Sequence, residues 1–213
     1  MEQQRIFPTG TAGRGLSPED LIAKLSDYKP LSHDIRGDHD LNGFRPEPDN
    51  REAAVLVLLV RREDDLSILF TKRTDHLSNH PGQISFPGGH TEEEDETAEH
   101  AALRETEEEV GIPDDRIEVI GQLNDYVTRT GFRVTPIVGM IDAPYEINPD
   151  PHEVAEVFEV PLSFLLDSAN HQKCSRIFQG VKRHFWAMPY EDYYIWGATA
   201  GMLRNLYSIL NEE

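Results

Sequence analysis

The chain has 213 residues, 38% hydrophobic content and a formal net charge of −19. This length and hydrophobic content suit one globular domain, with or without a terminal arm. The charge argues against binding to a nucleic-acid backbone, and the longest apolar run, residues 53–60, is too short to cross a bilayer. The single cysteine, Cys174, excludes a disulfide framework. With no apolar leader at the N-terminus, we expect a cytoplasmic protein with no membrane or nucleic-acid partner.

Residues 1–50 have the composition of an N-terminal arm. Ser17 and Pro18 form a good helix start, and the apolar pattern that follows predicts a short amphipathic helix to about Asp27. The segment from 34 to 50 is rich in Gly, Pro and Asp and predicts a solvated linker. Its opening imitates a calcium-binding loop, but Asp49 stands at the twelfth position where that loop needs Glu. We therefore expect an arm, residues 1–50, and a main domain, residues 51–213.

Short apolar runs and two longer periodic segments define the main domain. Strands are expected at residues 53–60, 66–71, 83–86, 117–123, 132–140, 153–160, 175–179 and 182–188. Helices are expected up to Val110 from an N-cap at Thr97 or Asp95, over 161–167, and over 195–210. Residues 126–131 have turn chemistry, and 148–151 form a rigid loop. This order predicts an α/β protein with a mixed β-sheet and helices on both faces.

The helix that ends at Val110 carries an unfavourable arrangement of acids. Glu105, Glu108 and Glu109 project within an arc of about 100°. Like charges at these spacings repel by a few tenths of a kcal/mol per pair, and the helix dipole disfavours anions in the last turns. A solvated acidic face is the simpler interpretation. A divalent cation would explain the cluster better, because hard oxygen ligands suit Mg²⁺ or Mn²⁺.

The surroundings of these acids resemble the signature of the Nudix hydrolases. Glu96, seven residues and then the run from Arg104 to Ile112, RETEEEVGI, follow the pattern Glu, seven residues, Arg-Glu-U-x-Glu-Glu-x-Gly-U, where U is apolar. Thr106 replaces a bulkier apolar residue, and six residues separate Gly89 from Glu96 where the general signature has five. The resemblance implies a Nudix-type α/β/α sandwich and metal-dependent hydrolysis of a diphosphate linkage.

The longer spacer and the run from Leu69 to Gly89 are similar to the coenzyme A diphosphatase branch. LFTKRTDHLSNHPGQISFPGG follows that branch's L-L-T-x-R-S, a gap, R, a gap and G-x-V-x-F-P-G-G, with Ser78 in place of the second arginine. The resemblance implies cleavage of coenzyme A or its thioesters into adenosine 3′,5′-bisphosphate and 4′-phosphopantetheine. ADP-ribose or another nucleoside diphosphate derivative is the alternative substrate. A non-catalytic nucleotide-binding module of the same fold is disfavoured, because all the helix acids are present.

The resemblance also implies roles for individual residues. Glu105 and Glu109 are expected to bind the metal, and Glu108 either binds a further metal or serves as general base. The Gly88-Gly89 turn lets the backbone approach closely, so the Gly88 carbonyl can complete the metal shell and the turn can contact substrate.

Three further side chains are candidates around this centre. Arg104 is expected to orient a carboxylate by a bidentate pair. Arg73 contacts phosphate or forms a surface ion pair, two alternatives of equal weight. Glu153 and Glu156 are alternative bases, although charges on a strand face are the simpler interpretation of both.

A dense aromatic set lies near the C-terminus: Phe185, Trp186, Tyr190, Tyr193, Tyr194 and Trp196. Core packing or a subunit interface is the main interpretation, and contact with an adenine ring is the alternative. Arms such as residues 1–50 often pack across a dimer, so a homodimer remains an open alternative.

Overall fold

The apolar run after residue 50 forms the middle strand of the fold. The computed structural model of this protein describes residues 17–30, 36–43, 51–63, 65–77 and 80–211. In it, β2 (Arg51–Arg61) pairs in parallel with β8 (Phe132–Asp142) and antiparallel with β3 (Leu66–Arg73). A strand paired on both sides and covered on both faces must be apolar throughout, which is why the run lacks the usual alternation.

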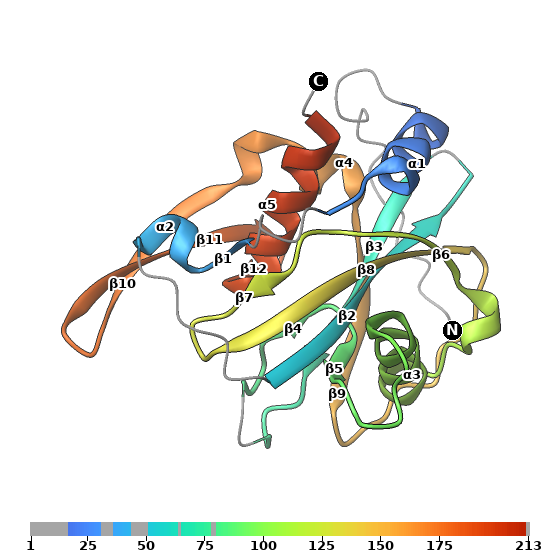
Figure 1. Cartoon of the computed structure of the whole chain (residues 1–213), viewed down its shortest axis with the longest axis horizontal. Coiled ribbons are helices and arrows are strands. Elements are labelled where there is room, and N and C mark those ends of the chain that lie inside the picture. Colours follow the sequence, from blue (N-terminus) through green and yellow to red (C-terminus); the bar gives the residue numbers. More distant parts are fainter. Residues whose placement is uncertain (1–16, 31–35, 44–50, 64, 78–79, 212–213) are drawn as a thin grey trace.

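Within the described residues, nine strands form one mixed sheet in the order β1-β7-β8-β2-β3-β4, with β5 on β2, β6 on β8 and β9 on β3. The remaining strands of this sheet are β1 (Arg36–Gly37), β4 (Ile84–Ser85), β5 (Gly88–His90), β6 (Glu118–Gln122), β7 (Tyr126–Val127) and β9 (Val154–Pro161). A second, three-stranded antiparallel sheet contains β10 (Gln172–Phe178), β11 (Val181–Tyr190) and β12 (Tyr193–Trp196). Figure 1 shows the β10–β11 hairpin projecting from the side of the molecule away from α3 (Ala98–Val110).

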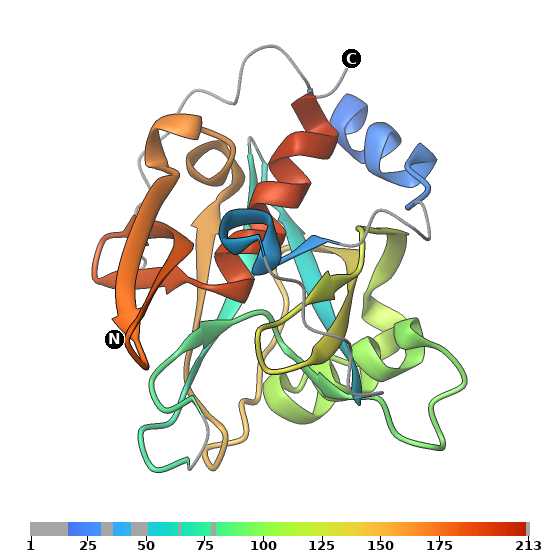
Figure 2. The ribbon, with the colours of Figure 1, turned by 60° about the vertical axis from the view of Figure 1, so that its left-hand side comes forward.

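Helices cover both faces of the main sheet. Leu56 and Leu58 of β2 belong to the apolar cluster that contains the buried side of α3. Val57 and Leu59 point the other way, into the cluster formed with α1 (Pro18–Asp27) and α5 (Ala198–Asn211). Figure 2 shows α1 and α5 on one side of the sheet and α3 on the other. The predicted α/β/α sandwich with a mixed sheet is therefore confirmed.

The N-terminal helix packs on this sandwich. Ser17 caps α1 in a reciprocal capping box with Asp20, and Leu21 and Leu25 are buried in the core. The Lys24 ammonium donates a hydrogen bond to the carbonyl of Leu210 at 2.9 Å, which joins α1 to the end of α5. The remaining short elements are α2 (His39–Asn42), α4 (Leu162–Leu165), and 3₁₀ turns at Asp114–Arg116 and Ser168–Asn170.

The structure corrects three local predictions. Residues 36–43 are not linker but form β1 and α2, because Asn42 exchanges hydrogen bonds with the backbone of His184. The predicted turn at residues 126–131 begins with the short strand β7. The last helix starts at Ala198 rather than residue 195, because β12 and a left-handed Gly197 precede it. In the part of the chain described, no helix is long and apolar enough to cross a membrane.

Candidate active site

The acidic helix α3 is fixed at both ends. The Thr97 hydroxyl accepts a hydrogen bond from the His100 amide at 3.1 Å, so Thr97 is the N-cap. At the other end, Gly111 adopts a left-handed conformation, φ 75°. The amides of Asn148 and Asp150 donate to the carbonyls of Val110 and Glu109, at 2.8 Å and 3.1 Å. The rigid loop around residue 150 therefore satisfies carbonyls that the helix end leaves open.

The two glycines before the helix allow a close approach of backbone to neighbouring groups. β5 lies antiparallel to β2, with Gly88 opposite Val55. A Cβ atom on Gly88 would lie 2.3 Å from the Ala54 carbonyl oxygen, at a φ of +144°. A Cβ atom on Gly89 would lie 2.5 Å from the Glu105 carboxylate. Only a glycine at position 89 leaves the Glu105 side chain in its place against β5.

Arg104 holds several acceptors at once. Its Nε and Nη2 atoms donate to the two carboxylate oxygens of Asp95, at 3.1 Å and 2.9 Å. Nη2 also donates to the His90 carbonyl at 3.1 Å, and Nη1 to Glu105 and Glu108, each at 3.2 Å. The bidentate pair holds the pKa of the buried Asp95 carboxyl at about 2. Asp95, rather than the neighbouring exposed Glu96, is thus the acid that anchors Arg104.

Glu109 is the most unusual carboxylate of the site. Its side chain is only 6% exposed, and burial raises its pKa to about 8, with the charges of Glu105 and Glu153 adding to the shift. The Gly88 amide donates to it at 3.3 Å, and the Arg73 guanidinium lies 3.7 Å away. These two contacts oppose the shift but do not offset the desolvation.

The structure places the other predicted acids at different distances from this centre. Burial also raises the pKa of Glu105, with the charges of Glu108 and Glu153 adding to it, whereas Glu108 is 61% exposed. Glu153 follows the loop that caps α3, and its charge acts on both Glu105 and Glu109. Glu156 lies apart, on β9, where it accepts a hydrogen bond from the Tyr193 hydroxyl at 2.5 Å. Ser78 lies outside the described residues.

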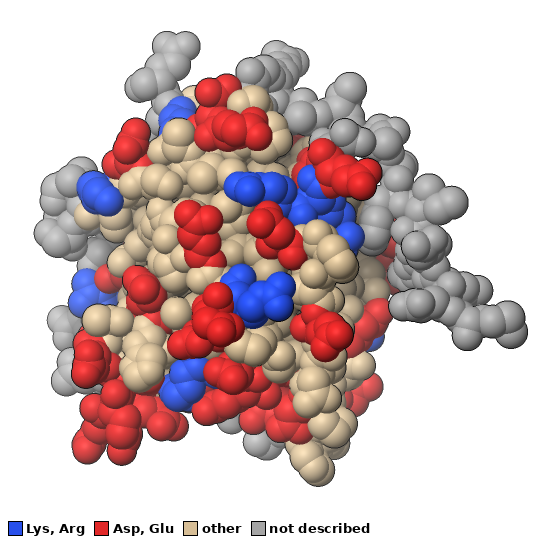
Figure 3. Space-filling view, turned by 90° about the vertical axis from the view of Figure 1, so that its right-hand side faces the viewer, with Lys and Arg blue, Asp and Glu red and all other residues tan. Residues whose placement is uncertain are grey.

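The donor set fits a hard divalent cation. Glu105, Glu108 and Glu109 supply carboxylate oxygens near a glycine turn, and such hard oxygen donors suit Mg²⁺ or Mn²⁺. Among the described residues, no three His, Cys, Asp or Glu side chains converge closely enough to hold a metal. Arg73, Arg104 and the Gly88 amide occupy the oxygens instead. The surface around α3 and β6 is otherwise mainly acidic, with single basic side chains between the acids (Figure 3).

Comparison with known proteins identifies relatives of this chain. The sequence profile of the NUDIX domain matches residues 50–179. The chain is 44% identical over 195 residues to a protein of Escherichia coli K12 described as "Uncharacterized Nudix hydrolase NudL", with 91% of this chain and 94% of the relative covered. It is 41% identical over 183 residues to the NudL protein of Enterobacter sp. strain 638, covering 82% of this chain and 95% of that one.

Solved structures show weaker similarity. The Nudix hydrolase RenU of M. smegmatis matches with 23% identity and a TM-score of 0.44, over 52% of this chain and 70% of that chain. The NUDIX domain of Shewanella oneidensis NrtR, complexed with ADP ribose, matches with 20% identity and a TM-score of 0.42, over 71% and 87%.

The site is thus a capped helix of glutamates that packs against a Gly-Gly turn inside an α/β/α sandwich. With the profile match and the relatives above, the chain belongs to the Nudix hydrolase family.

Glu109→Gln is expected to stabilise the metal-free protein at high pH. The pKa of Glu109 is about 8 in the fold against 4.5 for an ordinary glutamate, so the folded chain holds more protons between these values and stability falls as pH rises through them. At about pH 9 the variant should gain about 1–3 kcal/mol of unfolding free energy, and the gain should disappear below about pH 4.5. Denaturant unfolding in EDTA measures this. Glu107→Gln, an exposed acid of the same helix, is the control; an equal gain at every pH would contradict the assignment.

Gly89→Ala is expected to reduce turnover without unfolding the protein. The new Cβ atom would lie 2.5 Å from the Glu105 carboxylate and displace it, and a misplacement of about 1 Å can cost about a hundredfold in rate. Gly88→Ala should instead lower the melting temperature, because its Cβ atom would meet the Ala54 carbonyl. Steady-state kinetics and thermal unfolding separate the two effects. Full activity in Gly89→Ala would rule out the tight Glu105 packing.

Proposed function

We propose that this chain hydrolyses the diphosphate linkage of coenzyme A or its thioesters, giving adenosine 3′,5′-bisphosphate and 4′-phosphopantetheine. One observation carries the proposal. Two described parts of the segment that resembles the coenzyme A branch, Arg73 at the end of β3 and the Gly88-Gly89 turn, lie against the acids of α3. Arg73 from this segment pairs with Glu109, and Gly89 lies against Glu105. The branch-specific residues and the general family acids are therefore parts of one site.

In this proposal some residues bind the metal, and Arg104 holds the metal-binding carboxylates in position. Glu105 and Glu109 hold a divalent cation, with Glu108 as a further ligand or the base and the Gly88 carbonyl as an additional donor. A bound Mg²⁺ or Mn²⁺ supplies charge neutralisation of the diphosphate and a water of lowered pKa. Arg104 touches neither substrate nor water in this scheme but fixes Glu105 and Glu108 relative to β5.

Arg73 is the residue most suited to contact the substrate phosphate. Its Nη1 atom faces Glu109, and its Nε atom is buried with no hydrogen-bond acceptor among the described residues. When Glu109 holds a cation, the guanidinium is free to turn toward a phosphate oxygen. A planar guanidinium suits that contact because it donates two parallel hydrogen bonds.

The general base is one of two carboxylates. Glu108 is on α3, is well exposed and is held by Arg104. Glu153 stands beside the site because the loop around residue 150 is bonded to the end of α3 and the Thr74 amide donates to the Glu153 carbonyl at 2.9 Å. Glu156 is the weakest candidate, because its carboxylate is engaged by Tyr193.

Three broader expectations remain predictions. The division at residue 50, a homodimer and a cytoplasmic location each rest on sequence composition. ADP-ribose or another nucleoside diphosphate derivative remains the alternative substrate, since Ser78 replaces an arginine of the coenzyme A pattern. A non-catalytic nucleotide-binding module remains disfavoured by the complete set of acids.

The substrate is tested by incubating the protein and Mg²⁺ with coenzyme A, ADP-ribose and NADH separately. We expect adenosine 3′,5′-bisphosphate and 4′-phosphopantetheine from coenzyme A, resolved by chromatography. EDTA should abolish the reaction, and Glu109→Gln should reduce kcat/KM by about a hundredfold or more. Turnover of ADP-ribose alone would eliminate the coenzyme A proposal. No turnover of any substrate with Mg²⁺ or Mn²⁺ would favour a binding module.

The base is tested by pH–rate profiles of Glu108→Gln and Glu153→Gln. Loss of a general base costs about 10²–10⁴ in rate and removes the acidic limb of the profile. We expect one variant to lose that limb and the other to keep it. Glu107→Gln, exposed on the same helix, should keep the unchanged profile. Normal profiles in both test variants would show that neither carboxylate is the base.

A further inference from the structure

A cavity lined by arginines and aromatic rings lies at the β10–β11 hairpin, away from the glutamates of α3. Its volume is about 280 Å³, and its lining includes Arg129, Arg176, Arg183, Phe178, Phe185 and Trp196. We call it the hairpin pocket. None of its lining residues belongs to the site described above, and Figure 1 shows the hairpin on the side of the molecule away from α3.

The hairpin pocket is positively charged in a strongly acidic protein. The chain has a net charge of −19, yet residues 168–190 contain four Lys or Arg residues and no Asp or Glu. Within the described part of the chain, Arg129, Arg176 and Arg183 form no ion pair. Among the described residues, Asp38 is the one acid that lines the pocket. Its carboxylate already accepts hydrogen bonds from the Tyr126 hydroxyl at 2.7 Å and the Arg129 amide at 2.9 Å.

Two of these arginines stand in an unfavourable register. Arg176 of β10 and Arg183 of β11 are directly opposite each other across the antiparallel pair. Like charges in that position destabilise a hairpin. The Nε atom of Arg183 is also buried with no hydrogen-bond acceptor among the described residues, although buried donors are normally paired. An anion between these guanidiniums would remove both costs.

Stacking on aromatic rings explains only part of the cluster. The Arg176 guanidinium lies 4.6 Å from the Trp196 ring centroid, and Arg129 lies 4.1 Å from that of Phe178. Such contacts hold a cation in place. They do not supply an acceptor for Arg183 Nε, and they do not offset the repulsion between Arg176 and Arg183.

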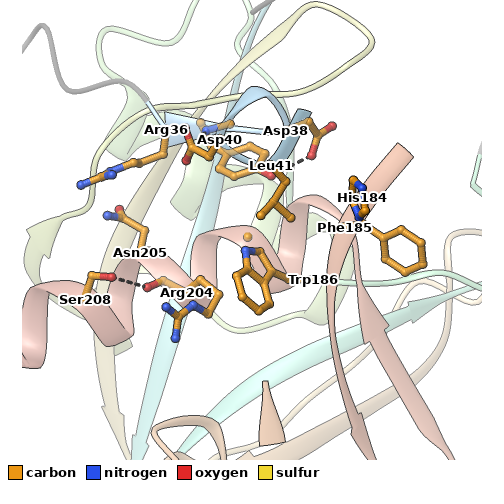
Figure 4. Close-up of a pocket in the computed structure, with 14 residues that line it drawn as sticks. Arg36, Asp38, Asp40, Leu41, His184, Phe185, Trp186, Arg204, Asn205 and Ser208 are labelled. Atoms are coloured by element: carbon orange, nitrogen blue, oxygen red, sulfur yellow. Dashed lines mark hydrogen bonds between the residues drawn. The ribbon is translucent and has the colours of Figure 1, made fainter. Parts of the chain in front are cut away.

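A smaller cavity of about 180 Å³ adjoins the hairpin pocket and shares Asp38, His184, Phe185 and Gly197 with it. Figure 4 shows this adjoining cavity, with Arg36 on one side, Arg204 on α5 and Trp186 on β11. Its two arginines are matched by two acids, Asp38 and Asp40. The excess positive charge is therefore confined to the hairpin pocket, and the adjoining cavity suits the uncharged part of a ligand.

We propose that the hairpin pocket binds the phosphate groups of a small phosphorylated ligand of nucleotide size. Guanidinium groups match phosphate oxygens in geometry and charge, and the adjoining aromatic cavity has room for a sugar or base. The hairpin pocket shares no lining residue with the glutamate site of α3, so the proposal does not depend on which substrate is hydrolysed.

Intrinsic fluorescence tests this directly, because both tryptophans of the chain line these cavities, Trp186 the adjoining one and Trp196 the hairpin pocket. The protein is titrated in EDTA with inorganic phosphate, adenosine 3′,5′-bisphosphate and adenosine. We expect saturable changes with the bisphosphate and none with adenosine. If inorganic phosphate binds as tightly as the bisphosphate, free phosphate is the ligand. If inorganic phosphate binds more weakly than the bisphosphate, the ligand is a nucleotide. Either result supports the site.

Neighbouring residues of one strand provide matched variants. Arg183→Gln and Arg176→Gln should each raise Kd for the bisphosphate by about tenfold or more, since each removes a charge-assisted contact. Lys182→Gln loses the same charge, but residue 182 is not among the lining residues; its Kd should change by less than about twofold. Glu109→Gln should have the same Kd for the bisphosphate as the unchanged protein. Thermal unfolding of Arg183→Gln should show no loss of stability, because the substitution removes a repulsive cross-strand pair.

Several results would overturn the proposal. These are an absence of fluorescence change with both phosphorylated probes, an unchanged Kd in Arg183→Gln and Arg176→Gln, or an equal loss in Lys182→Gln. Tight binding of single-stranded RNA, together with no response to the small probes, would replace the small ligand with a nucleic acid.

Discussion

The candidate site depends on holding carboxylates where burial and the helix dipole disfavour their charged form. Glu105, Glu108 and Glu109 stand toward the negative end of the α3 dipole, and burial, with neighbouring acids adding to it, raises the pKa of Glu105 and Glu109. Their cost is limited by nearby donors: Arg104 of the same helix lies beside Glu105 and Glu108, and Arg73 of β3 and the Gly88 amide of β5 lie beside Glu109. Burial is what makes Glu109 hard to ionise, and a bound cation would favour its charged form.

Holding these carboxylates in place requires contacts to α3 from three segments: β2, β5 and the loop around residue 150. β2 is buried on both faces, so its even-numbered residues hold α3 while its odd-numbered residues hold α1 and α5. β5 then lies on β2 with its glycines directly against Ala54 and Glu105. The loop around residue 150 closes the helix end and brings Glu153 beside the site. The same contacts therefore stabilise the core and position the acids of the site, so few of the residues that make them tolerate substitution.

Periodicity and family resemblance were enough to predict the sandwich, the long strands, the extent of α3 and the acids on it. What they missed depends on contacts between distant segments. β5 was predicted only as a turn, because two glycines have no strand preference until β2 supplies a partner. Asp95 was considered only as a helix cap, although it anchors Arg104, because spacing does not reveal a bidentate pair across a loop. Glu153 had the pattern of a strand-face charge until the loop contacts with α3 placed it.

The distribution of charge explains how so acidic a protein can bind phosphates. A net charge of −19 repels anionic ligands at long range, but screening confines that field to about 8–10 Å in physiological salt. Within a binding site, the charges nearest to the ligand determine whether an anion is attracted or repelled. At α3 a cation would have to reverse the local sign, whereas three arginines and one acid, Asp38, line the hairpin pocket among the described residues. The two proposed sites would therefore bind phosphate for different reasons, one through a metal and one through guanidinium groups, and only the first should respond to a chelator.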